Sequence, residues 1–174
     1  RQHGRGEMDR GGLIAAAGRV DEARLAALLE NPYFAAPFPK SLDRFDFPAG
    51  LADGLSVEDG AALLTAFAAA AVARAVSMLP ETIDRLVICG GGRHNPTLMR
   101  DIAHRSGVTV LSADDLGWRG DAIEAECFAY LAARCVAGLD ASYPGTTGVP
   151  APLPAGRLVH PRGSATLCGS GDKD

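Results

Sequence analysis

The stretch Leu86-Val87-Ile88-Cys89-Gly90-Gly91-Gly92-Arg93-His94-Asn95-Pro96 joins a run of four apolar residues to three glycines and a helix start. Because residues 86–89 show no polar alternation, they predict a strand buried on both faces, as in a parallel sheet covered by helices. Asn95 suits a helix cap, since its side-chain oxygen can accept a backbone N–H, and Pro96 suits the first helical position. The stretch therefore predicts a strand, a tight turn and a helix.

The three glycines, Gly90, Gly91 and Gly92, follow the predicted strand at its carboxyl end, where open α/β sheets bind their ligands. Without Cβ atoms they let a ligand approach the backbone. As a dinucleotide fingerprint the pattern is incomplete, because the polar Asn95 stands where a third small residue is expected. The turn is a candidate nucleotide site, although a glycine-rich turn that binds nothing explains this pattern equally well.

Length and composition predict one domain of ordinary size, because the chain has 174 residues and 47% of them are hydrophobic. A net charge of -4 without a basic block argues against nucleic acid or an anionic membrane as the main partner. The longest apolar stretch, residues 66–73, is too short to span a bilayer. No secretory leader is visible and residue 1 is Arg, so we expect a cytoplasmic protein whose natural start lies upstream.

The cysteines and histidines are scattered along the chain and predict no metal site built from side chains. Cys89, Cys127, Cys135 and Cys168 form no C-x-x-C pair, and the four histidines lack the spacing of metal ligands. Three of the cysteines lie in apolar segments, so reduced thiols in the core are expected.

Hydrophobic periodicity predicts the elements before the glycine turn. Residues 1–12 are expected to be a loose end, residues 21–30 a short helix, and residues 31–55 an ordered, aromatic-rich loop. Ser56 is expected to cap a long helix that ends near Leu79. The predicted buried stripe of that helix consists of Leu64, Phe67, Ala71, Ala75 and Leu79.

After the turn, the helix at residues 95–105 leads to a second apolar run at residues 108–111, which predicts a right-handed βαβ unit. The tail from residue 143 is rich in Pro and Gly and contains one candidate strand at residues 157–160. Two clear strands are fewer than a helix-covered parallel sheet needs. Either the aromatic loop contains strands or the sheet begins upstream of residue 1.

A further helix is predicted from Asp121 to Val136, and its first turn carries a candidate functional carboxylate, Glu124. Glu124 lies on the same helix face as three apolar residues, Phe128, Leu131 and Cys135. Glu126 is about 200° around the helix and should face elsewhere. The same Asp-x-x-Glu spacing is also a capping box, in which Glu124 would bond back to the backbone of Asp121. Both interpretations stay open on spacing alone.

Several short motifs occur together in an order and spacing that resemble the carboxyl-terminal half of anhydro-N-acetylmuramic acid kinase. These motifs are Asn31-Pro32-Tyr33-Phe34, Pro39-Lys40-Ser41, the glycine turn through Pro96, Ile123-Glu124-Ala125 with Phe128-Ala129-Tyr130-Leu131-Ala132, and Pro144 with Thr147-Gly148. The resemblance runs from about Met8 to Pro161. It implies an α/β fold, the second lobe of an actin-like, sugar-kinase-type (ribonuclease H-like) ATPase truncated at its first strands. Residues 13–162 would form this lobe, between the loose end and a disordered tail at residues 163–174.

The resemblance also implies an activity for the full enzyme, which would use ATP with Mg²⁺ and water. The enzyme would open the anhydro sugar and phosphorylate its 6-hydroxyl to give N-acetylmuramic acid 6-phosphate, in peptidoglycan recycling. Gly90, Gly91, Gly92 and Asn95 would lie against the adenosine of ATP, and Glu124 near the sugar and the attacking water. The phosphate-gripping loop and the main catalytic Asp would belong to an N-terminal lobe upstream, so this chain alone is expected to be inactive. A homodimer is a further option for the full enzyme.

Some residues depart from the family pattern. Leu42-Asp43 stands where a Thr-Gly pair is usual, and Leu63 and Ala68 stand where hydroxyl residues are usual. The segment Pro39-Lys40-Ser41 is expected to be structural or to lie beside the cleft, with no catalytic role assigned.

Two alternatives from other functional classes remain. One is a noncatalytic nucleotide-binding or interaction module of the same fold, which the departures at Leu63 and Ala68 favour. The other is a Rossmann-type oxidoreductase, with Asp114 or Asp115 as the acid that binds the ribose. The missing third glycine and the Asn95 cap count against the oxidoreductase.

Overall fold

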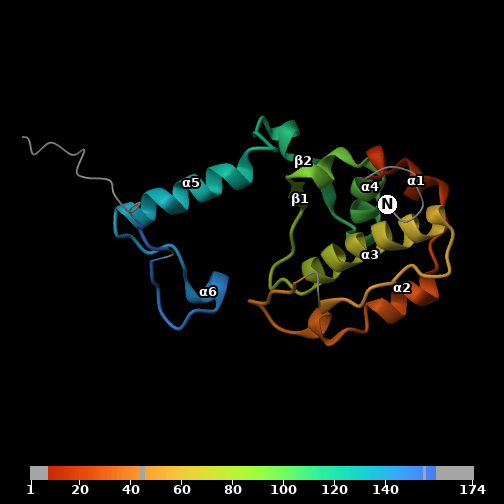
Figure 1. The fold of residues 1–174 in the computed structure, drawn as a ribbon, viewed down its shortest axis with the longest axis horizontal. Coiled ribbons are helices and arrows are strands. Elements are labelled where there is room, and N and C mark those ends of the chain that lie inside the picture. Colours follow the sequence, from red (N-terminus) through yellow and green to blue (C-terminus); the bar gives the residue numbers. More distant parts are fainter. Residues whose placement is uncertain (1–7, 44–45, 155, 160–174) are drawn as a thin grey trace, which may run out of the picture. The chain divides into compact units, whose positions relative to one another are not determined.

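The structure, a computed structural model, describes residues 8–43, 46–154 and 156–159 (Figure 1). Contacts divide the chain into two compact units, residues 1–126 and residues 127–174, called here the first and the second unit. The helix α5 (Ile123–Val136) begins in the first unit and continues into the second.

The first unit is an α/β arrangement with helices before, between and after two strands. In chain order its other elements are η1 (Arg10–Gly12), α1 (Leu13–Ala17), α2 (Glu22–Leu28), η2 (Pro32–Ala35), α3 (Val57–Ser77), β1 (Arg85–Ile88), η4 (Gly91–His94), α4 (Pro96–Ser106), β2 (Thr109–Ser112) and η5 (Ala113–Leu116), where η marks a 3₁₀-helix.

Strands β1 and β2 are parallel, and α4 connects them, so the predicted βαβ connectivity is confirmed. Their register runs from Arg85 opposite Thr109 to Ile88 opposite Ser112. The prediction that β1 is buried on both faces is wrong, because its apolar side chains are only half-buried and Cys89 lies exposed beyond its end. The sheet has no third strand among the described residues, which leaves β1 with a neighbour on one side only.

Helix α3 is the centre of the hydrophobic core, and it contacts α1, α2 and α4 (Figure 1). It begins as predicted, because Ser56 Oγ accepts the Asp59 N–H at 3.1 Å. The predicted stripe is partly wrong, since Leu64 is 43% exposed and Leu79 is 40% exposed. Helices pack on more than one side of α3, so its buried surface is broader and is centred elsewhere. The buried apolar side chains of α3 are Ala62, Leu63, Ala66, Phe67, Ala69 and Ala70.

By length and hydropathy alone, α3 could also cross a membrane. Its contacts explain the composition in another way, because Leu63 and Ala66 are fully buried against the rest of the first unit. Many alanines allow neighbouring helices to approach α3 closely. The helix therefore has the environment of a core helix.

The segment between α2 and α3 is an ordered, aromatic-rich loop in its described part, as predicted. The ring of Phe67 on α3 makes edge contacts with Phe34 and Phe47, with centroids 5.7 Å and 5.3 Å away. Lys40 Nζ donates to the carbonyl oxygen of Tyr33 at 2.9 Å and lies 4.8 Å from the centre of the Tyr33 ring. Lys40 thus fastens this loop, which fits a structural role for the Pro39-Lys40-Ser41 segment.

Part of the N-terminal end that was predicted to be loose takes up regular structure. Residues 1–7 lie outside the described part, but Arg10–Gly12 form η1 and Gly12 is buried. Thr97 Oγ1 donates to the carbonyl oxygen of Gly12 at 2.9 Å. A Cβ atom on Gly12 would collide with Asn95 and Thr97, so this segment packs tightly on the start of α4.

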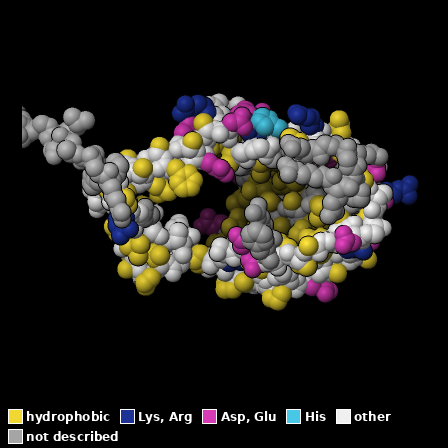
Figure 2. Space-filling view, in the orientation of Figure 1, with side chains coloured by type: hydrophobic (Ala, Val, Ile, Leu, Met, Phe, Trp, Pro, Cys, Tyr) yellow, Lys and Arg dark blue, Asp and Glu magenta, His cyan; other side chains and the backbone are white. Residues whose placement is uncertain are grey.

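The second unit contains most of α5, the short helix α6 (Pro144–Thr147) and an isolated bridge between Ser142 and Leu153. No side chain of α5 is buried, and Figure 2 shows hydrophobic side chains at the surface along this helix. Residues 157–159 form no strand, so that prediction is wrong for the part described. His160 and the predicted disordered tail, residues 163–174, lie outside the described residues.

The prediction that the cysteines are core thiols is wrong for two of them. Cys89 and Cys127 are exposed, whereas Cys135 is half-buried and Cys168 lies outside the described residues. Cys89 follows the last residue of β1, and Cys127 lies on the exposed helix α5, so their apolar sequence context did not imply burial.

Candidate functional site

The glycine turn lies where β1 ends, and η5 lies where β2 ends. Because the strands are parallel, both ends meet at the same edge of the sheet. Gly90 has φ 70° and ψ -173°, a conformation that side chains with a Cβ rarely adopt. A Cβ atom on Gly90 or Gly91 would have no atom within 4 Å. The backbone of the turn is therefore open to a ligand.

Asn95 caps α4 as predicted, because its Oδ1 accepts the Leu98 N–H at 3.0 Å. Pro96 takes the first helical position, and the helix ends at Gly107 in the left-handed conformation. Gly91 and Gly92 belong to the short helix η4, so the glycine turn is one helical turn followed by the cap of α4. The local rules for caps explain this part of the site completely.

Arg93 is the residue at this edge that the sequence interpretation missed. Its side chain is only 3% exposed. Its Nε donates to Asp114 Oδ2 at 2.7 Å, and its Nη1 donates to Asp121 Oδ1 at 2.5 Å and to the Gly90 carbonyl at 2.9 Å. The sequence contained one sign of this network. Asp114 and Asp121 both follow β2, and in a parallel sheet the residues after β2 lie at the same edge as the glycine turn.

These ion pairs shift the pKa of each member. The hydrogen bond from Arg93, with a smaller contribution from His94, lowers the pKa of Asp121 from its ordinary 3.8 to about 2, although burial opposes the shift. Arg93 likewise holds the pKa of Asp114 below its ordinary value. The hydrogen bonds to Asp121 and then to Asp114 raise the pKa of Arg93. All three groups are therefore charged near neutral pH.

The contacts of Asp114 and Asp115 argue against the oxidoreductase alternative. Asp114 binds Arg93, and Asp115 Oδ2 accepts the Ser112 N–H at 2.8 Å within a capping box that begins η5. Both carboxylates are thus engaged in hydrogen bonds within the protein, whereas the acid of a dinucleotide site must be available to the ribose hydroxyls.

The capping-box interpretation of Glu124 is wrong. Helix α5 begins at Ile123, and the carboxylate of Asp121 accepts from Arg93. In the part of the chain that the structure describes, Glu124 makes no hydrogen bond or ion pair and is exposed. Glu126 instead pairs with Arg119. Glu124 is therefore an available carboxylate in the first turn of α5.

Within residues 8–43, 46–154 and 156–159, no group of three or more His, Cys, Asp or Glu side chains could hold a metal ion. The carboxylates nearest the glycine turn, Asp114 and Asp121, are occupied by the buried Arg93 guanidinium. The described residues at this edge therefore do not form a site that fits Mg²⁺ by themselves.

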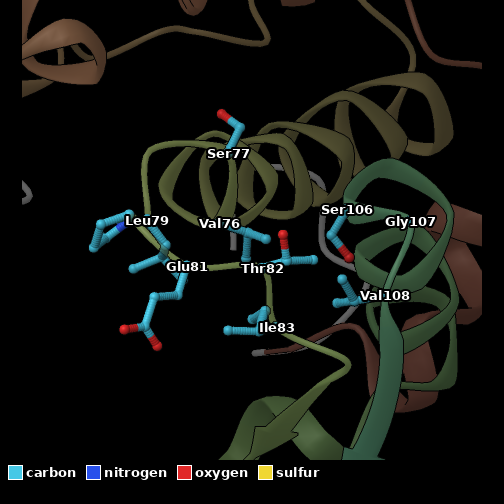
Figure 3. Close-up of a pocket in the computed structure, with 10 residues that line it drawn as sticks. Val76, Ser77, Leu79, Glu81, Thr82, Ile83, Ser106, Gly107 and Val108 are labelled. Atoms are coloured by element: carbon cyan, nitrogen blue, oxygen red, sulfur yellow. The ribbon is translucent and has the colours of Figure 1, made fainter.

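A pocket of about 440 Å³ lies at the other end of the strands, between the end of α3 and the residues that precede β1 and β2 (Figure 3). Ser77 and Ser106 are among its lining residues, and their hydroxyls donate to carbonyl oxygens of their own helices, at 2.8 Å and 2.6 Å. The other polar side chains that line this pocket, Glu81 and Thr82, are exposed, so none of its polar groups is buried against a ligand. The glycine turn remains the better candidate for a ligand site.

Comparison with known proteins places the chain in a family. The sequence model described as anhydro-N-acetylmuramic acid kinase matches residues 1–160. A protein of that name from Rhizobium rhizogenes is 61% identical over 159 residues, which are 91% of this chain and 43% of the relative. Proteins of the same name from Mesorhizobium japonicum and Caulobacter vibrioides are each 59% identical over 156 residues, which are 90% of this chain and 42% of each relative. The chain therefore spans less than half the length of these relatives, and it belongs to the anhydro-N-acetylmuramic acid kinase family.

Proposed function

We propose that this chain is the carboxyl-terminal part of a cytoplasmic kinase that uses ATP and water to convert anhydro-N-acetylmuramic acid to N-acetylmuramic acid 6-phosphate in peptidoglycan recycling. The observation that carries the proposal is the family match over residues 1–160. Relatives with 59–61% identity bear the name of this kinase and are more than twice as long as the matched region. The activity is assigned to the longer protein.

The first unit would be part of the second lobe of an actin-like ATPase, truncated at its first strands. Its parallel βαβ unit, with α4 crossing between β1 and β2, supports this assignment. The rest of the relatives' length would provide the N-terminal lobe, with the phosphate-gripping loop and the main catalytic Asp. The described part has a two-stranded sheet and an α5 without buried residues, which is compatible with a lobe that needs that partner. A homodimer is the oligomeric state proposed for the full enzyme.

The departures from the family pattern do not favour a noncatalytic module. Leu63 is fully buried in the hydrophobic core around α3, so its replacement of a hydroxyl residue is a change of packing. Ala68 lies on an exposed part of the same helix. Neither residue belongs to the glycine turn or to the network around Arg93.

The nucleotide site would be formed by Gly90, Gly91, Gly92 and Asn95, against the adenosine of ATP. The open space beside Gly90 and Gly91 at the carboxyl end of β1 supports this placement. Bound Mg²⁺ neutralises charge on the phosphates in phosphoryl transfer. The described residues offer no cluster of three or more ligands for it, which fits an ion held mainly by phosphate oxygens and water.

Replacing Gly91 by Val tests the nucleotide site in the full-length protein. The new side chain would enter open space and needs no unusual φ, so folding should be unaffected. We expect Gly91→Val to weaken ATP binding at least roughly tenfold, because the branched side chain would fill the space beside the backbone where the adenosine would lie. Isothermal titration calorimetry with a nonhydrolysable ATP analogue measures this change.

The matched control is Gly145→Val, which also places a branched side chain in open space but lies on α6. Its affinity for the nucleotide should equal that of the wild type. Equal affinities for all three proteins would show that the adenosine does not lie on the glycine turn.

Glu124 would hold or polarise the water that attacks the sugar. Its exposure and its lack of a partner among the described residues leave its carboxylate available for this task. Glu124→Gln in the full-length enzyme should lower kcat by roughly a hundredfold or more, since acid–base assistance commonly contributes ~10² to 10⁴. Steady-state kinetics together with melting temperatures separates this loss from misfolding.

Glu126→Gln is the control on the same helix, because Glu126 is already engaged by Arg119. We expect only a small change in kcat for this variant. Wild-type turnover in Glu124→Gln would remove Glu124 from the catalytic machinery.

A further inference from the structure

The side chain of Arg93 joins its own glycine turn to two segments that lie 21 and 28 residues further along the chain. It binds the Gly90 carbonyl in the glycine turn, Asp114 after β2 and Asp121 just before α5. Only 3% of this side chain is exposed, while the two carboxylates are 49% and 73% exposed. The guanidinium is thus the buried centre of the network, and the carboxylates lie around it.

Backbone hydrogen bonds strengthen the same contact between Gly90, Arg93, Asp114 and Asp121, called here the joint. The Gly90 N–H donates to the Gly120 carbonyl at 3.0 Å, and the Gly120 N–H donates to Asp114 Oδ1 at 3.3 Å. A Cβ atom on Gly120 would collide with the Arg93 side chain, so the guanidinium lies directly against this backbone. The segment that precedes α5 is therefore fastened to the glycine turn by backbone and side chain together.

The segment between the joint and Glu124 is short and folded. Asp121 precedes Glu124 by three residues, and the Ala122 N–H donates to the Arg119 carbonyl at 2.8 Å in a turn. Helix α5 starts at Ile123, immediately after this turn. A shift of the Arg93–Asp121 pair would therefore move the first turn of α5, on which Glu124 lies.

We infer that Arg93 is a positioning residue that, through Asp121, sets the place of Glu124 relative to the nucleotide turn. The inference rests on the proposed function, because the glycine turn and Glu124 have their roles in nucleotide binding and catalysis only under that proposal. Arginine suits this task, since its planar group offers several donors in fixed directions, whereas the ammonium of Lys is a single point charge. Small errors of placement can cost an enzyme as much as ~10² in rate.

A double-variant cycle in the full-length protein tests this inference, with Asp121→Asn, Glu124→Gln and the double variant. Asp121→Asn should lower kcat about tenfold and change the KM for ATP by less than about threefold, because it loosens the start of α5 but leaves the turn's bond to Arg93. The double variant should be no more than about twofold slower than Glu124→Gln, because Asp121 acts only through Glu124. Arg93→Lys should show the same lack of additivity with Glu124→Gln.

The control is Asp101→Asn, which removes an ion pair with Arg100 on α4 at 3.1 Å but touches no part of the joint. Its kcat should equal that of the wild type. The melting temperature of Asp121→Asn should fall only slightly below the wild-type value, and the variant should still fold, since this carboxylate is 73% exposed. Loss of folding in this variant would overturn the inference in favour of a purely structural pair.

Two kinetic outcomes would also overturn it. One is wild-type kcat in Asp121→Asn, and the other is a double variant whose loss equals the product of the two single losses. Failure of the proposed function gives a different result, namely wild-type turnover in Glu124→Gln. The positioning inference and the catalytic role of Glu124 can thus fail separately.

Discussion

The two units of the chain are held together in different ways. In the first unit, Leu25 and Leu63 are fully buried in a core that also contains the aromatic ring of Phe34. In the second unit, no described hydrophobic residue is buried, and Phe128 and Val136 are 72% and 70% exposed. Burial of apolar surface therefore explains the first unit, whereas the described contacts of the second unit are mainly polar.

Each unit also has an arginine with several partners, and the partners differ. Arg93 of the first unit binds two carboxylates and is buried. Arg134 of the second unit binds the hydroxyls of Tyr130 and Tyr143 and the carbonyl oxygen of Asp140. Only the first network contains charges that acid can remove, so pH should distinguish the two units.

The largest effect expected from this comparison is a difference between core and surface substitutions. In the 174-residue chain, Leu63→Ala should lower the free energy of unfolding by about 2–5 kcal/mol, because it leaves a cavity in the core around α3. Phe128→Ala should change it by less than about 0.5 kcal/mol, because the side chain is largely in water. Urea unfolding at low protein concentration measures both values.

Equal losses in the two variants would break the comparison, since they would mean that Phe128 is buried in the isolated chain. Leu64→Ala is a useful third variant, because Leu64 is 43% exposed although it is next to Leu63. Its cost should fall between the other two.

A smaller effect is expected in acid. Because the folded-state pKa of Asp121 is about 2 and its ordinary value is 3.8, its contribution to stability is fully present above about pH 4 and is lost as pH falls through 2. The difference in unfolding midpoint between the wild type and Asp121→Asn should therefore shrink between pH 4 and pH 2. Urea unfolding at a series of pH values measures the midpoint of each protein.

The matched variant in the second unit is Arg134→Met, whose wild-type partners are hydroxyl and carbonyl groups. Its difference from the wild type should vary less over the same pH range. A difference for Asp121→Asn that stays constant between pH 4 and pH 2 would show that ionisation of Asp121 adds nothing to folding stability.

The parts of the fold that could be predicted from the sequence follow local rules. Ser56 and Asn95 cap their helices through contacts within three residues, and Gly107 ends α4 in a left-handed conformation. The βαβ unit follows from two apolar runs on either side of a capped helix. Such features depend on a few neighbouring residues, so one sequence is sufficient to find them.

The features that were missed depend on contacts between distant segments. Arg93 and Asp121 are 28 positions apart, and nothing in their local patterns shows that they pair. The buried face of α3 depends on which helices pack against it, so periodicity placed Leu64 inside and gave no role to Leu63. The capping box at Glu124 failed for the same reason, because a distant arginine binds the expected cap residue.

Phosphate transfer by the full-length protein tests the central claim most directly, namely that this chain is one part of an ATP-dependent sugar kinase. The measurement compares the transfer of radiolabelled phosphate from ATP to anhydro-N-acetylmuramic acid by the full-length protein and by the 174-residue chain alone. We expect phosphorylated N-acetylmuramic acid from the full-length protein and none from the chain, because phosphoryl transfer needs groups positioned on both sides of the phosphates. Product from the chain alone, or none from a folded full-length protein, would contradict the claim.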